Sequence, residues 1–199
     1  GWMASQSSRF RLVWIALVGA FRFHQRYRLS ASSGIPYDEG IVSLLGKPTQ
    51  DLHCTDIELI LRSMALLQDG NSYSPKMVSF LNTYSQKSKS FTNAHIVYLQ
   101  KLFLSFIDAC SELGSKAFFR NNRFSKTLFE SVFVAVCRPS FEKQLLVKQK
   151  INKSSFEKLK EDVGFISFLQ SGSSSSDNIR GRITRATQII QLTGENYDE

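Results

Sequence analysis

Few side chains in this sequence could do chemistry, and they form no familiar catalytic arrangement. The three histidines, His24, His53 and His95, lie in three separate segments, and no two have the spacing of a metal-binding motif such as HExxH. The sequence contains no Walker A loop, no GxGxxG loop and no GxSxG elbow. We therefore predict that this chain is not an enzyme, with no catalytic residue, no metal site and no cofactor.

The densest group of acids lies around residues 51–58. Asp51, Asp56 and Glu58 are close in sequence to His53 and Cys54, as in a metal site or an acid/base cluster. The other interpretation is the N-terminal end of a helix, where the helix dipole favours acidic side chains. We favour the second interpretation.

A mixed basic and aromatic motif, FFRNNRF, lies between two apolar segments. Its polar residues are Arg120, Asn121, Asn122 and Arg123. Guanidinium, amide and aromatic groups together can clamp a phosphate and stack a base. The alternative is that these residues cap the following helix.

The motif IRGRITR places three further arginines, Arg180, Arg182 and Arg185, on a predicted helix. A basic helical face of this kind can lie along a phosphate backbone, and the alternative is a face that only meets solvent. There is no helix-turn-helix or zinc-finger pattern, so the sequence does not predict sequence-specific readout of DNA.

Arg62 interrupts the apolar segment IELILRSMALL. A buried arginine needs a carboxylate or a carbonyl partner, because an unpaired buried charge is costly. We predict a structural ion pair, with contact to a bound anion as the alternative.

Composition limits the class of protein and of partner. The chain has 199 residues, a hydrophobic fraction of 42% and 16 phenylalanines, which is ample for a core. The formal net charge of +8 favours acidic partners, DNA among them. Three widely spaced cysteines argue against a disulfide framework and favour the reducing cytoplasm.

The elements that must position these side chains are predicted to be helices. Apolar residues recur at helical spacing in most of the chain, and no segment alternates as a strand would. The pattern predicts an all-α fold, an irregular bundle of about seven to eight helices. The predicted helices are Arg9–Leu29, Asp38–Leu45, Thr55–Gln68, one that begins at Pro75, Asn93–Leu113, Ser125–Cys137, a lysine-rich stretch from Phe141, and Asp177–Leu192.

Three parts are predicted along the chain. Residues 1–36 form an apolar and basic helix and a loop, residues 37–170 a helical core, and residues 171–199 a serine-rich connector and a basic helix. The apolar segment Leu12–Phe21 is about half of the ~20 residues that cross a bilayer, so we expect no membrane span. We expect it to contact a protein partner or a second copy of the chain.

Three stretches carry a resemblance to a known family. They are DIELILRSMALL with the later MVSFLNTY, then FFRNNRFSKTLFESVFVAV, and then SSSSDNIRGRITRATQII. Their order resembles the helical C-terminal half of the bacterial domain-of-unknown-function 262 family, which includes GmrS-like subunits of modification-dependent restriction systems. The matching positions are Asp56, Glu58, Leu59, Leu61, Arg62, Phe80, Leu81, Asn82, Phe119, Arg120, Phe129 and Glu130.

The resemblance implies a structural role for Asp56, Glu58, Arg62, Asn82 and Glu130. Family members also carry an N-terminal ParB/sulfiredoxin-like domain with a DGQQR-type motif for nucleotide handling, and this sequence lacks that motif. The resemblance therefore implies a non-catalytic interaction or regulatory module of a restriction or phage-defence protein, which engages DNA in one version of this hypothesis. The alternative hypothesis is a self-contained nucleic-acid-binding protein.

Overall fold

The computed structural model describes residues 55–170 and 174–194, and every structural statement below concerns these residues. The predicted helices Arg9–Leu29 and Asp38–Leu45 lie outside them. So do His24, Asp51, His53 and Cys54, as well as the side chain of Asp56.

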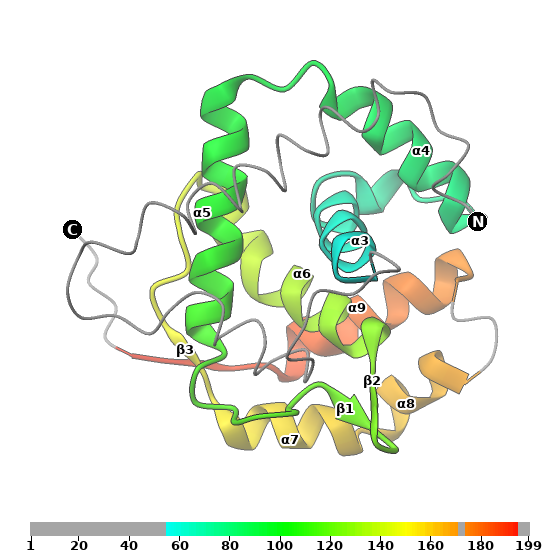
Figure 1. Ribbon diagram of the computed structural model, residues 1–199. Coiled ribbons are helices and arrows are strands. Elements are labelled where there is room, and N and C mark those ends of the chain that lie inside the picture. Colours follow the sequence, from blue (N-terminus) through cyan, green and yellow to red (C-terminus); the bar gives the residue numbers. More distant parts are fainter. Residues whose placement is uncertain (1–54, 171–173, 195–199) are drawn as a thin grey trace.

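The described part of the chain is all-α, as predicted (Figure 1). Its α-helices are α3 (Thr55–Asp69), α4 (Met77–Ser88), α5 (Asn93–Ala109), α6 (Lys126–Glu142), α7 (Lys153–Glu161), α8 (Val163–Gln170) and α9 (Ser176–Ile189). A 3-10 turn, η3 (Gly70–Ser72), follows α3. Two-residue strands form two small antiparallel pairs, β1 (Phe119–Arg120) with β2 (Arg123–Phe124), and β3 (Lys150–Ile151) with β4 (Leu192–Thr193).

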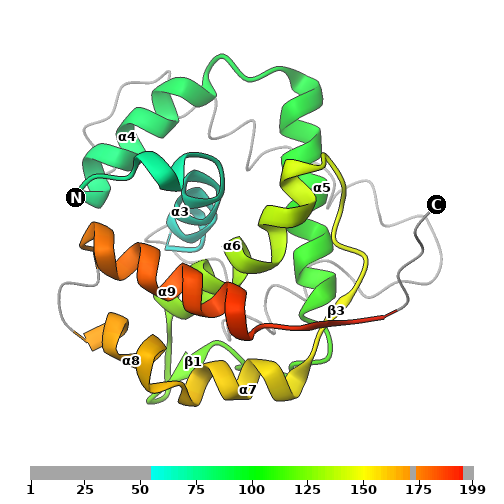
Figure 2. The ribbon, with the colours of Figure 1, turned by 180° about the vertical axis from the view of Figure 1, so that it is seen from behind.

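Helix α6 is the centre of the fold. The side chain of Ser125 caps it by accepting a hydrogen bond from the N–H of Leu128 at 3.3 Å. Every residue from Leu128 to Cys137 is buried, so this helix is covered on all sides. Helices α3 and α9 both pack against it, and Figures 1 and 2 show α6 between them.

Phenylalanine rings fill the space between α5, α6 and the segment before β1. Phe106 packs edge-on against Phe133 with ring centroids 5.0 Å apart, and against Phe129 at 5.5 Å. Phe118 meets Phe129 at 5.1 Å and Phe156 of α7 at 5.2 Å. Edge-to-face packing adds to the hydrophobic gain of burial, so these rings join α5, α6 and α7 into one core.

Helix α6 continues past Pro139, so the predicted end of this helix at Cys137 is wrong. Pro139 is exposed and lies inside the helix, which runs to Glu142. The last turn is held from outside, because Phe141 packs on Tyr98 of α5 with centroids 6.2 Å apart. The Tyr98 hydroxyl also donates to the carbonyl of Leu145 at 3.1 Å. These contacts offset the backbone hydrogen bond that proline removes.

Helix α4 begins at Met77 instead of Pro75. Lys76 before it has a φ of 98°, a left-handed conformation that breaks the helix. The preceding segment is tied to the start of α9, because the Tyr73 hydroxyl donates to the carbonyl of Ser174 at 2.6 Å and Ser176 Oγ donates to the carbonyl of Tyr73 at 3.4 Å. These bonds hold Tyr73 outside the helix.

Helix α9 ends at Ile189, and the residues after it form a short strand that the sequence did not predict. Leu192 pairs with Ile151, and the N–H of Asn152 donates to the carbonyl of Gln191 at 2.8 Å. Figure 1 shows this C-terminal segment, in red, meeting the yellow chain at β3. Ile151 of β3 lies 41 residues before Leu192, and its pairing with Leu192 takes the place of a further helical turn.

Helix α5 ends at Ala109 instead of the predicted Leu113, and Gly114 adopts a left-handed φ of +83° in the turn that follows. In the lysine-rich stretch, Phe156 and Leu159 of α7 are fully buried, whereas Val163 at the start of α8 is 81% exposed.

Replacement of Phe129 by alanine tests the aromatic core. Phe129 is 1% exposed, so Phe129→Ala should lower the free energy of unfolding by about 3–5 kcal/mol, through lost burial and a residual cavity. Val163→Ala is the control, and the exposed site should change stability by less than about 0.5 kcal/mol. Urea unfolding followed by circular dichroism measures both, and equal effects of the two variants would contradict the assignment.

Candidate nucleic-acid interface

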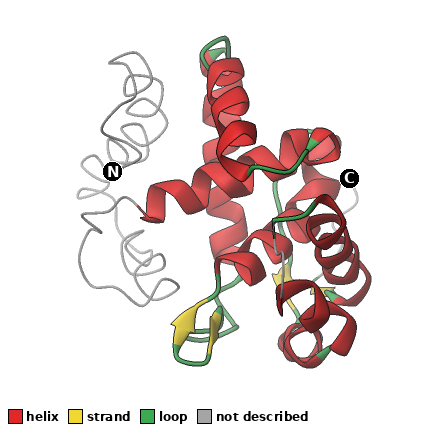
Figure 3. Cartoon of the chain, turned by 90° about the vertical axis from the view of Figure 1, so that its right-hand side faces the viewer, coloured by secondary structure: helices red, strands yellow, loops and turns green. Residues whose placement is uncertain are grey.

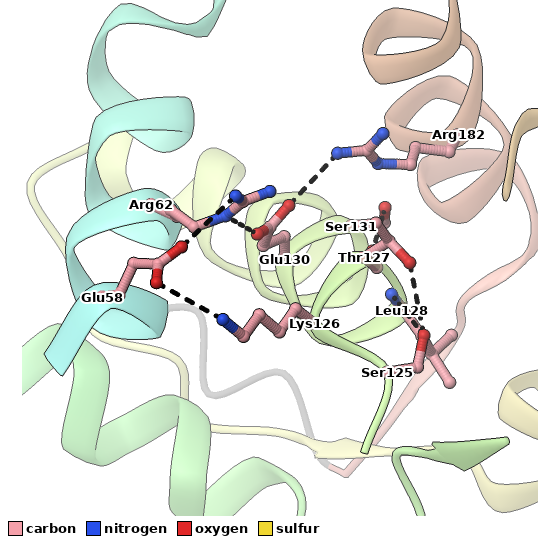
Figure 4. A network of polar contacts seen from close by, with 9 residues as sticks. All are labelled: Glu58, Arg62, Ser125, Lys126, Thr127, Leu128, Glu130, Ser131 and Arg182. Carbon is pink, nitrogen blue, oxygen red and sulfur yellow. Dashed lines mark hydrogen bonds and ion pairs between the residues drawn. The ribbon is translucent and has the colours of Figure 1, made fainter. Parts of the chain in front are cut away.

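One buried carboxylate joins the three central helices. Glu130 of α6 is fully buried and lies between two arginines from different helices (Figure 4). Arg62 of α3 donates through Nε to Glu130 Oε1, and Arg182 of α9 donates through Nη2 to Glu130 Oε2 at 3.1 Å. The structural ion pair predicted for Arg62 is therefore present.

A second carboxylate extends this network to the start of α6. Glu58 lies 3.6 Å from Arg62 Nη1 and 3.4 Å from Lys126 Nζ. Three of the residues given a structural role by the family resemblance, Glu58, Arg62 and Glu130, thus meet in one network. Asn82 does not join them; it lies on α4, with its side-chain oxygen buried and without a hydrogen-bond partner among the described residues.

The two arginines that share Glu130 differ in the direction of their pKa shifts. Burial lowers the pKa of Arg62, but the charges and hydrogen bond of Glu130, together with Glu58, outweigh it and leave the pKa above its usual value. Burial also lowers the pKa of Arg182; Glu130 opposes this, the positive charge of Arg62 adds to it, and the pKa stays below its usual value. Arg62, with two carboxylates, therefore has the more favourable environment for its charge.

The basic face predicted for the last helix is wrong. Arg182 is fully buried against α6, and Arg185 pairs with Asp162, with Nε 3.0 Å from Oδ1. Only Arg180 of the three predicted arginines is exposed. Arg182 follows Ile179 by three residues and precedes Ala186 by four, so it lies on the apolar face that packs on the core. That spacing was visible in the sequence.

The motif FFRNNRF forms a tight β-hairpin, β1–β2. Phe119 pairs with Phe124 and Arg120 with Arg123, and Asn121 and Asn122 form the turn with φ values of 49° and 59°. Positive φ at both central residues is typical of a type I′ turn, for which asparagine is one of the few suitable residues. The hairpin does not cap α6, because Ser125 does so.

The hairpin is anchored to the core at its base. The rings of Phe119 and Phe124 meet edge-on with centroids 5.9 Å apart, and the N–H of Ser125 donates to the carbonyl of Phe118 at 2.8 Å. Phe118 itself is fully buried. The two arginines are therefore presented by a well-anchored element.

The pairing of Arg120 with Arg123 concentrates positive charge. Like charges directly opposite each other on two strands destabilise the pair. No carboxylate among the described residues forms an ion pair with either arginine. Nη1 of Arg120 is buried and has no hydrogen-bond partner within residues 55–170 and 174–194. An anion bound between the two guanidinium groups would relieve this repulsion.

His95 takes part in a small polar cluster away from the hairpin. Its Nε2 lies 3.0 Å from Gln68 Oε1, and Gln68 in turn donates to the hydroxyl of Tyr84. Burial, with a smaller contribution from the charge of Lys87, lowers the pKa of His95. The hydrogen bonds of the cluster join α3, α4 and α5, so we interpret it as structural.

Among the described residues, the remaining reactive groups do not gather into a metal site. Within the described ranges, no three His, Cys, Asp or Glu side chains lie together as metal ligands, and no helix is long and apolar enough to cross a membrane. Cys110 and Cys137 are buried free thiols whose pKa values are raised by that burial. Thiols of this kind are unreactive.

Comparison with protein-family models finds no matching family, and comparisons with curated proteins and with solved structures find no matching protein.

Replacement of Glu130 tests the buried network. Glu130→Gln leaves two buried arginines without a full counter-charge, and we expect a loss of about 3–5 kcal/mol in the free energy of unfolding. Glu142→Gln removes an exposed carboxylate from the same helix and should change stability by less than about 0.5 kcal/mol. Chemical denaturation measures both variants, and a Glu130→Gln protein as stable as the control would refute the structural role.

The lowered pKa of His95 predicts a pH dependence of stability. Below its usual value of 6.5 the unfolded chain binds a proton at His95 more readily than the folded chain does. The stabilisation from neutral His95 is therefore present above pH 6.5 and is lost as pH falls through the folded pKa. His95→Gln should flatten this part of the curve, measured as urea midpoints between about pH 7.5 and 5.5. Parallel curves for the two proteins would contradict the prediction.

Proposed function

We propose that this chain is a non-catalytic helical interaction module of a restriction-type or phage-defence protein, and that it engages a nucleic-acid backbone through the β1–β2 hairpin. The observation that carries the proposal is the pairing of Arg120 with Arg123 without a carboxylate partner among the described residues.

Phosphate is the anion that suits two opposed guanidinium groups. Arginine offers a planar fork of N–H donors that matches phosphate oxygens, and such charge-assisted bonds are strong. The two groups stand at the same level of a narrow hairpin, so they can contact one phosphate or two neighbouring ones. The formal net charge of +8 supports the choice of a polyanion, because it speeds encounter with nucleic acid.

The non-catalytic part of the proposal rests on how the polar residues are used. Glu58 pairs with Arg62 within α3, and Glu130 of α6 pairs with Arg62 and with Arg182 of α9. Each of these four residues therefore has a structural partner. The resemblance of three stretches to the domain-of-unknown-function 262 family supports a place in a restriction or defence system. The surface that would meet a protein partner is proposed to lie in residues 1–36, outside the described residues.

Removal of the two hairpin arginines tests this function. The double variant Arg120→Gln, Arg123→Gln should bind a short DNA duplex at least about tenfold more weakly than the native chain at low salt. The slope of log affinity against log salt should become shallower by about 2, because about two phosphate contacts are lost. Fluorescence anisotropy at several salt concentrations measures both quantities.

A matched variant controls for net charge. The double variant Lys89→Gln, Lys143→Gln also removes two positive charges, but from exposed positions outside the hairpin. Lys143 follows the far end of α6, whose 17 residues span about 25 Å, and Lys89 follows α4 at the opposite end of the molecule from the hairpin (Figure 1). This variant should bind within about twofold of the native chain. Equal weakening by both double variants would overturn the assignment to the hairpin.

A further inference from the structure

The tip of the hairpin presents hydrogen-bonding groups that no other described residue uses. Asn121, Asn122 and Arg123 are all exposed. Neither asparagine side chain makes a hydrogen bond with the described part of the chain, and Arg123 makes no ion pair there. Figure 3 shows the hairpin at the edge of the molecule, projecting from the helices.

The shape of the hairpin matches one groove of one nucleic acid. The major groove of B-form DNA is about 12 Å wide and admits a two-stranded β-ribbon, whereas the minor groove is about 6 Å wide. Beyond the anchored Phe119–Phe124 pair, the Arg120–Arg123 pair, at about 3.4 Å per residue, and the two-residue turn form the part that would enter the groove, which is about 8.5 Å deep. The major groove of A-form RNA is deep and too narrow for side chains to read, and a single strand has no groove.

The groups at the tip also match what that groove displays. Asparagine can bond to N6 and N7 of adenine. Arg120 and Arg123 pair with each other next to the turn, so they suit phosphates at the rim of the groove. The anchored turn has little freedom left to lose on binding, which favours affinity.

From these observations we infer that the β1–β2 hairpin reads base edges in the major groove of B-form DNA, with Asn121 and Asn122 as the specificity-determining residues. The inference rests on the proposed function and names its nucleic acid. It also supplies a mode of readout that requires no helix-turn-helix.

Glycine substitution separates this role from a purely conformational one. Asparagine suits positive φ, but glycine suits the same turn at least as well. Asn121→Gly with Asn122→Gly therefore keeps the hairpin and removes only the two amides. The matched control is Asn93→Gly, which removes an exposed amide at the start of α5.

The experiment begins with selection from a library of random B-form DNA duplexes with the native chain. We expect an enriched sequence that is bound about tenfold or more tightly than a scrambled duplex, and more tightly than an RNA duplex or a single strand of the same sequence. The double glycine variant should lose this preference and keep its affinity for scrambled DNA within about twofold, while the control keeps both.

Three outcomes would overturn the inference: no enriched sequence, equal binding of RNA duplex or single strands, or a glycine variant that keeps the preference. Each of them leaves the proposed function standing if Arg120→Gln with Arg123→Gln still weakens binding. Absence of binding to every nucleic acid, or binding unchanged by those arginine substitutions, would overturn the proposed function as well. The two failures are therefore distinguishable.

Discussion

The carboxylate of Glu130 holds two arginines from distant parts of the chain, and the arrangement of the central helices depends on it. Arg62 and Arg182 are 120 positions apart in sequence, yet both reach this one buried group. A buried ion pair adds little net stability over apolar side chains of the same volume. Removal of one partner is nevertheless very costly, because the other charge stays buried without compensation. We infer that the pairing selects one register of α3 and α9 on α6.

The position of the β1–β2 hairpin depends on the packing of these central helices. Only Ser125 separates β2 from α6, and Ser125 caps that helix. Lys126, the first residue of α6, pairs with Glu58, which also contacts Arg62. On the other side, Phe118 packs into the aromatic core just before β1. The charged tip is thus held between an ion-pair network and a ring cluster, which suits a surface that must present fixed groups to a ligand.

The arginines of this chain illustrate how identical side chains take opposite roles. Arg182 lies on the apolar face of its helix, so folding buries it and a carboxylate must neutralise it. Arg120 and Arg123 pair with each other across the short β1–β2 hairpin, and no described carboxylate forms an ion pair with them. From the sequence, Arg182 and the pair Arg120 and Arg123 were equally good candidates for contact with nucleic acid. The difference is one of burial, because desolvation compels pairing inside the protein and leaves surface charge available.

Local information in the sequence was enough for the all-α class and for most helices, because apolar spacing of three and four residues decides which face is buried. It was also enough to predict an ion pair for Arg62, since apolar neighbours imply burial. Contacts between distant segments decided the rest. The ring contact of Phe141 with Tyr98 stabilises the part of α6 that follows Pro139. The pairing of β4 with β3 sets the end of α9. Only the tertiary structure identifies Glu130 as the partner of Arg62 and places Arg120 opposite Arg123. No local propensity specifies which distant groups become neighbours.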